Sequence, residues 1–98
     1  MKHHSVRLFT NAGAITIDPS PVVVKPGDTI SWRSDEGKIA VSFTDAPLDA
    51  LQFSAERHGA TKLAHVRDDA LPGKFKCTAS IDGNLAPAIY GIEIEPRP

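Results

Sequence analysis

The feature that most constrains the fold of this chain is the recurrence of short alternating segments separated by turn-forming residues. In residues 14–18, for example, Ile15 and Ile17 fall on one face of an extended chain while Thr16 and Asp18 fall on the other. Such alternation is typical of a strand that buries one face. Comparable segments recur at residues 5–10, 22–25, 29–33, 39–43, 74–79 and 89–95. The pattern predicts an all-β chain folded as a two-sheet Greek-key β-sandwich.

Turn residues separate these segments at three clear places. They are Asn11-Ala-Gly13, Pro26-Gly27-Asp28 and Asp82-Gly-Asn84. Proline presets the first dihedral of a type II turn and glycine takes its positive φ, so we expect a left-handed conformation at Gly27.

The stretch from residue 46 to about residue 60 breaks the alternation. Leu48, Leu51 and Ala55, with Phe53 as a further candidate, have loose helical spacing, and Pro47 suits a first helical turn. We expect a short helix or an irregular excursion here, ending near Gly59, followed by a further strand over residues 62–67.

The length and charge of the chain bound its organisation and partners. A chain of 98 residues has enough apolar surface for one core, so we expect a single domain over residues 1–98, with residues 1–4 as a flexible tail. The net charge is −1 and the basic residues are scattered, so we expect no nucleic acid partner. No apolar run is long enough for a membrane span or a signal peptide. We expect a monomer or weak dimer in the cytoplasm, or in the periplasm if the chain is a processed form.

Three segments carry a resemblance to the cupredoxin family. They are the strand-turn-strand from Val24 to Trp32, the Pro72-Gly-Lys-Phe-Lys-Cys77 strand, and the closing strand from Ile89 to Ile94. Together they resemble small bacterial cupredoxin-like domains without copper, over most of the chain from Ile15 to Pro96. The resemblance implies a cupredoxin-like sandwich.

The resemblance also implies where copper ligands would stand in the electron carriers of this family. The first histidine would lie between Asp35 and Val41, where the chain has none, and the cysteine position falls on Ala79. No histidine or methionine follows Cys77. We therefore expect no blue-copper site. Cys77 alternates in phase with Phe75 and Ala79, which favours a role in core packing.

The remaining function classes are a binding module and a metal handler. No nucleophile motif or phosphate loop is present, so we expect no enzyme and no cofactor. The leading hypothesis is a non-enzymatic module that binds an unknown protein partner. Its candidate surface is three loops, residues 34–38, 72–73 and 82–88, and within them the candidate residues are Lys38, Asp82, Asn84 and Leu85. The Leu85-Ala-Pro-Ala88 stretch is apolar for a loop, so it either plugs the place of the missing copper or contacts a partner. We favour plugging, with Leu85 as the plugging side chain.

The alternative hypothesis concerns the first four residues. A free amine at Met1, the amides of Lys2 and His3 and the His3 imidazole would form a square-planar nitrogen set, with His4 as a possible axial ligand. This geometry suits Cu(II) or Ni(II). The alternative function is therefore the handling of either metal at the amino terminus.

Overall fold

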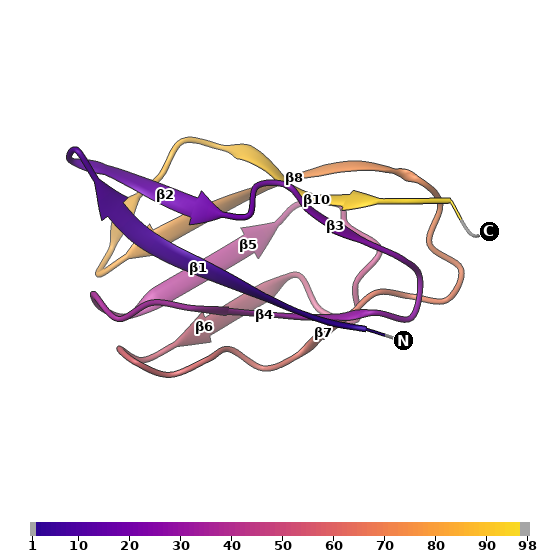
Figure 1. The fold of residues 1–98 in the computed structure, drawn as a ribbon, viewed down its shortest axis with the longest axis horizontal. Helices are drawn as coiled ribbons and strands as arrows, with labels where there is room; N and C mark the ends of the chain where they lie inside the picture. Colours follow the sequence, from indigo (N-terminus) through magenta and orange to yellow (C-terminus); the bar gives the residue numbers. More distant parts are fainter. Residues whose placement is uncertain (1, 97–98) are drawn as a thin grey trace.

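The computed structural model describes residues 2–96, and every regular element in that range is a β-strand (Figure 1). The strands are β1 (His3–Asn11), β2 (Ala14–Asp18), β3 (Val22–Val24), β4 (Thr29–Arg33), β5 (Ile39–Phe43), β6 (Gln52–Ala55), β7 (Ala64–His65), β8 (Gly73–Ile81), β9 (Asn84–Leu85) and β10 (Ile89–Ile94). The all-β prediction is confirmed, and the alternation of residues 14–18 and 29–33 gives the observed bounds of β2 and β4.

The strands form two mixed sheets. The first has the order β2-β1-β4-β7, and in it β1 runs parallel to β4 and antiparallel to β2. The second has the order β3-β10-β8-β5-β6, with β9 paired to β8. Residues 19–21 carry the chain from the first sheet to the second. The arrangement is consistent with a β-sandwich. Within residues 2–96, no helix is long and apolar enough to cross a membrane.

The core lies between the inward faces of the two sheets. Ile30 and Trp32 of β4 are buried, and the Trp32 ring packs against Phe43 of β5 and Phe53 of β6, with ring centroids 5.8 Å and 5.1 Å away. Trp32 belongs to the first sheet and both phenylalanines belong to the second, so burial of these three rings against one another stabilises the contact between the sheets.

The helix expected within residues 46–60 is wrong. Residues 52–55 form β6, which pairs antiparallel with β5 and places Phe53 opposite Val41. Phe53 is buried in this strand, whereas Leu51, which belonged to the same expected helical face, is exposed. Pairing with β5 and burial against Trp32 outweigh a weak local helical preference. The strand expected at residues 62–67 shortens to β7.

The phase expected for β10 is also wrong in one place. Unbroken alternation over residues 89–95 would place Tyr90 on the same face as Ile92 and Ile94, but Tyr90 is 47% exposed and both isoleucines are buried. The register with β8 shifts between Tyr90 and Ile92, so one extra residue reverses the alternation. The extra residue is Gly91, where the Cys77 sulfur occupies the space that a Cβ would need. Only glycine allows the two strands to approach this closely.

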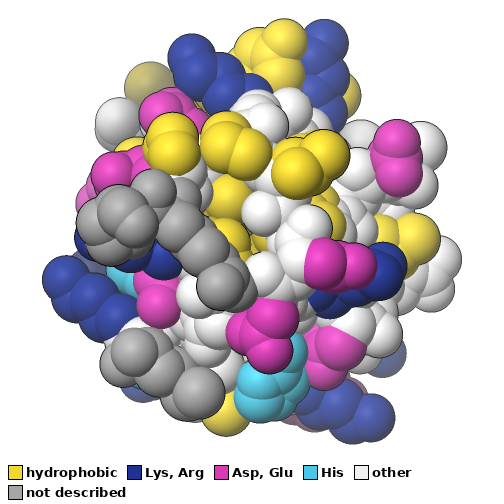
Figure 2. Space-filling view, turned by 90° about the vertical axis from the view of Figure 1, so that its right-hand side faces the viewer, with side chains coloured by type: hydrophobic (Ala, Val, Ile, Leu, Met, Phe, Trp, Pro, Cys, Tyr) yellow, Lys and Arg dark blue, Asp and Glu magenta, His cyan; other side chains and the backbone are white. Residues whose placement is uncertain are grey.

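The elongated molecule has two distinct ends. The β1–β2 turn, the β8–β9 turn and residues 34–38 lie together at the left of Figure 1, and we call this region the groove end. The β3–β4 turn and both termini lie at the right, which we call the amino-terminal end. Figure 2 looks straight at the amino-terminal end, where apolar side chains gather in the upper half and acidic side chains lie beside and below them.

Candidate functional site

A groove opens at the groove end between the two turns. It has a volume of about 590 Å³, within the range of ~300–1,000 Å³ that ligand pockets occupy. Its lining comes from β1, β2, the loop of residues 34–38, the end of β8 and the segment after it. The lining residues are Thr10, Gly13, Ala14, Ile15, Glu36, Ile81, Asp82, Asn84, Leu85 and Pro87.

Two tight hairpin turns build its walls. Ala12 and Gly13 have φ values of 52° and 82°, and Asp82 and Gly83 have 50° and 82°. Consecutive left-handed residues between paired antiparallel strands define a two-residue hairpin of the type I′ kind, whose twist matches that of the strands. Both turns are therefore held rigidly by their strands, and the groove walls are preformed.

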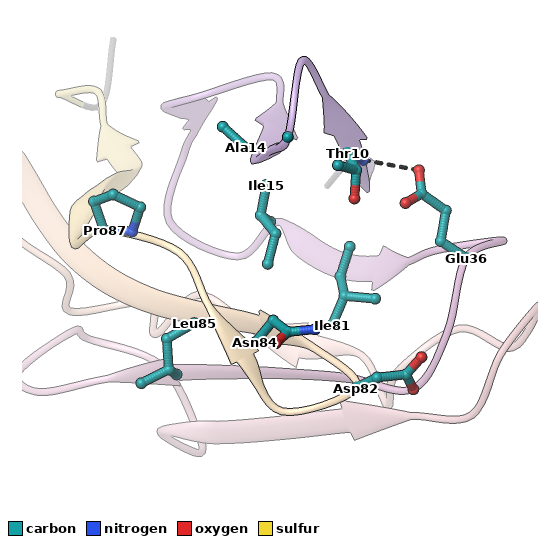
Figure 3. A pocket seen from close by; sticks show the side chains of 10 residues that line it. Thr10, Ala14, Ile15, Glu36, Ile81, Asp82, Asn84, Leu85 and Pro87 are labelled. Carbon is teal, nitrogen blue, oxygen red and sulfur yellow. Dashed lines mark hydrogen bonds between the residues drawn. The ribbon is translucent and has the colours of Figure 1, made fainter.

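Glu36 supplies one carboxylate to the groove. Its Oε2 accepts a hydrogen bond of 2.8 Å from the Thr10 N–H, which is the contact dashed in Figure 3. Hydrogen bonding with Thr10, through its side chain and its backbone N–H, lowers the pKa of Glu36 below its usual value. Glu36 is consequently a carboxylate at neutral pH, and no cationic side chain within residues 2–96 bonds it.

Asp82 supplies the second carboxylate. Its Oδ1 accepts a 2.9 Å hydrogen bond from the Lys38 N–H, while its own N–H donates to the Lys38 carbonyl at 2.7 Å. The carboxylate lies over Gly37, where any Cβ would collide with it. Gly37 thus lets the turn of Asp82 lie against the neighbouring loop, and Asp82 Oδ2 has no hydrogen-bond partner within the described chain.

Apolar side chains complete the groove. Ile15 and Ile81 lie between the two walls, and Figure 3 shows Glu36 and Asp82 to one side of this pair with Pro87 and Leu85 to the other. The groove is therefore polarised, with an acidic side and an apolar side.

The sequence-predicted loop residues divide into two groups. Asp82, Asn84 and Leu85 line the groove, whereas Lys38 lines an adjoining hollow together with Asp82. Residues 72–73 lie at the opposite end of β8, so the expectation that all three loops gather at one end is wrong for them.

The role expected of Leu85 is also wrong. Its side chain is 77% exposed, so it does not plug the fold. Ala86 reaches inward instead: it is 9% exposed, and its N–H donates to the Ala79 carbonyl at 2.8 Å. Pairing of β9 with β8 turns Leu85 outward and Ala86 inward. Because the sequence pattern indicated a loop over residues 82–88, it could not predict which of the two side chains faces the core.

Sequence reasoning missed the contribution of the first hairpin, and it included the loop of residues 34–38 without singling out Glu36. Thr10, Ala14 and Ile15 enter the site because β2 folds back on β1 beside the β8–β9 turn. The Asn11-Ala-Gly13 motif predicted the first turn correctly. It could not predict that the β8–β9 turn lies beside it, because that neighbourhood depends on how one sheet packs on the other.

The position that the cupredoxin resemblance assigns to the copper-binding cysteine holds a packed side chain. Ala79 is 2% exposed and faces the same side of the second sheet as its cross-strand partner Val41, also buried. Cys77, two residues earlier, is a free and buried thiol whose pKa is raised by desolvation to about 11. Its predicted packing role is confirmed by its contact with Gly91.

The proposed amino-terminal metal ligands are engaged in other contacts. His3 and His4 lie in β1, paired in register with Thr29 and Ile30, where a flexible tail was expected. The Lys2 N–H donates to Asp28 Oδ1 at 3.0 Å, and His3 Nδ1 lies 2.9 Å from the Thr29 hydroxyl. Met1 is outside the described residues.

Asp28 organises this end of the molecule. Its side chain is 8% exposed and accepts hydrogen bonds from the N–H groups of Lys2 and Lys25 and from His4 Nε2, the last at 2.9 Å. Burial alone would raise the pKa of Asp28, but the hydrogen bonds from His4, Lys25 and Lys2 lower it below the usual 3.8. The network ties the start of β1 to the β3–β4 turn.

Within residues 2–96, no group of three or more histidine, cysteine or acidic side chains converges in a way that could hold a metal ion. No protein-family model matches this chain, and a search of the curated proteins gives no match.

Proposed function

We propose that this protein is a non-enzymatic binding module, built on a metal-free cupredoxin-like Greek-key sandwich, that engages a protein partner at its groove end. The observation that carries the proposal is the preformed groove between the two hairpin turns. Rigid strands hold exposed turns and loops there, and binding residues are disproportionately found on such segments.

The chemistry of the lining supports binding over catalysis. The groove offers carboxylates, an amide and a hydroxyl, while no histidine, lysine or cysteine of the described chain lines it. General acid–base catalysis most often uses histidine, and an activated nucleophile needs an adjacent base. Cys77 is buried away from the groove, and a raised pKa makes it a poor nucleophile.

Site-specific photo-crosslinking tests the proposal. A photoreactive residue at position 84 lies in the groove, and one at position 74 lies on the same strand pair near the opposite end of β8. In a lysate of the source cells, we expect a discrete protein adduct from position 84 and none from position 74. Filling the groove with Ala14→Trp should remove the adduct. Equal labelling from both positions, or none from position 84, would refute the proposal.

A further inference from the structure

The polarity of the groove indicates the chemistry of its occupant. Glu36 accepts its printed hydrogen bond from the Thr10 N–H of β1, and Asp82 accepts one from the Lys38 N–H, which leaves Asp82 Oδ2 without a partner in the described chain. Neither carboxylate is bonded by a cationic side chain of residues 2–96. No Lys, Arg or His among residues 2–96 lines the groove. The acidic side therefore lacks a cation from its own lining.

The other side of the groove suits an aliphatic group. Ile15 is half-buried between the walls, and Leu85 and Pro87 are exposed beside it. An exposed leucine on a strand as short as β9 contributes little to the core, but it offers apolar surface to a ligand. A side chain lying along the groove would thus meet apolar surface first and carboxylates at its tip.

We propose that the groove binds an alkyl-guanidinium or alkyl-ammonium group presented as an arginine or lysine side chain of a partner protein. Such side chains pack their methylene stems on apolar surface while the charged head reaches a polar site. Guanidinium and ammonium groups donate to carboxylate oxygens, and these charge-assisted hydrogen bonds are stronger than neutral ones. This inference rests on the proposed binding function and names the chemistry of its ligand.

Lys38 is one internal competitor to consider, because its backbone bonds Asp82. Its backbone N–H and carbonyl bond Asp82, but it lines the adjoining hollow and not the groove. The cation must therefore come from another molecule, and the position of the carboxylates on preformed turns means that little ordering is needed on binding.

Backbone amide chemical shifts measured by NMR provide the test, with n-butylguanidinium as the first probe and pentanoate as its anionic counterpart. We expect n-butylguanidinium to shift the amides of Thr10, Glu36 and Asn84 and pentanoate to leave them unchanged. Added salt should weaken the effect, because the groove is open to solvent. Equal shifts with pentanoate, or no shifts at these amides, would overturn the proposal.

Charge-removing variants make the test specific. Glu36→Gln and Asp82→Asn keep an acceptor oxygen for Thr10 and Lys38, and asparagine tolerates the left-handed conformation at position 82. In the double variant we expect n-butylguanidinium affinity to fall about fivefold, the size expected for two solvent-accessible ion pairs. The matched control Glu93→Gln/Glu95→Gln removes the same charge from β10 and the residue after it, and should leave affinity unchanged. Unchanged affinity in the groove double variant would refute the inference.

Two peptides and a polyamine distinguish the source of the cation. The blocked tripeptide Ala-Arg-Ala should bind more tightly than spermidine, and Ala-Gln-Ala should not bind. Tighter binding of spermidine would overturn the assignment to a protein side chain. If crosslinking from position 84 is retained in the Glu36→Gln/Asp82→Asn variant, the ligand chemistry fails while the binding function stands.

Discussion

Asp28 and Asp82 are both turn carboxylates next to a glycine, yet they serve opposite ends of the molecule in different ways. Asp28 is 8% exposed at its side chain and its two oxygens accept three hydrogen bonds, from Lys2, Lys25 and His4. Asp82 is exposed and accepts one, from the Lys38 N–H. A saturated buried carboxylate holds structure together, whereas a partly used exposed one is available for a ligand.

The largest expected effect comes from removing the saturated carboxylate. Asp28→Ala leaves the donors of three partly buried hydrogen bonds, at Lys2, Lys25 and His4, without their acceptor. The substitution should lower the free energy of unfolding by about 2–4 kcal/mol. Asp82→Ala should cost less than about 1 kcal/mol, because water replaces the lost contact. Urea denaturation of the two variants measures the difference. Equal losses would show that the two ends do not differ in this way.

The next largest effect is expected in acid, where the stability that Asp28 contributes should be lost. The folded-state pKa of Asp28 is lowered, so this group contributes stability above its unfolded value of 3.8 and loses that contribution as pH falls through the folded pKa. The stability difference between the wild type and Asp28→Asn should therefore narrow below pH 3.8. Urea midpoints measured from neutral pH down to acid would reveal it. A gap that stays constant into strong acid would contradict the role assigned to Asp28.

Metal binding at the amino terminus should compete with the Asp28 network. A square-planar Cu(II) set needs the Lys2 amide and His3 Nδ1, which bond Asp28 and Thr29. Thr29→Val removes the hydroxyl partner of His3, and should raise Cu(II) affinity about fivefold, equivalent to one hydrogen bond of ~1 kcal/mol. Visible absorption during Cu(II) titration of untagged protein is the readout, and His3→Ala is the control without a site. Identical titrations of wild type and Thr29→Val would contradict the competition.

A smaller effect is expected within the groove end itself. Ala12 has a φ of 52°, a left-handed conformation that asparagine adopts more readily than alanine. Ala12→Asn should raise the free energy of unfolding by about 0.5–1 kcal/mol. The melting temperature of the variant measures the gain. A lower melting temperature would show that the hairpin is held by contacts other than its turn.

The smallest expected effect is at Leu85. Because its side chain is 77% exposed, Leu85→Ser should change the free energy of unfolding by less than about 0.5 kcal/mol. The same substitution should weaken n-butylguanidinium binding if the apolar side of the groove contacts the alkyl stem. Calorimetric melting together with the NMR titration separates the two outcomes. A large fall in melting temperature would return Leu85 to the core role that the sequence suggested.

The local sequence pattern was sufficient to predict those features that depend only on a few neighbouring residues of one strand or turn. The bounds of β2 and β4, the burial of Cys77 and the positive φ of Gly27, observed at 91°, were all predicted, although β4 is buried at four consecutive positions and does not alternate. The extent of a strand and the dihedral angles of a turn depend on a few consecutive residues, so they can be predicted from the sequence alone.

Tertiary contacts decided the rest. Phe53 became part of a strand because β5 offered a partner edge and Trp32 a packing surface, and Gly91 shifted the phase of β10 because Cys77 lies against it. The groove has the same origin, since Glu36, Ile15 and Asp82 are far apart in the chain and meet only when the two sheets pack. The sequence by itself thus determined strands and turns, whereas packing between sheets determined which turns became neighbours and which carboxylate was left facing solvent.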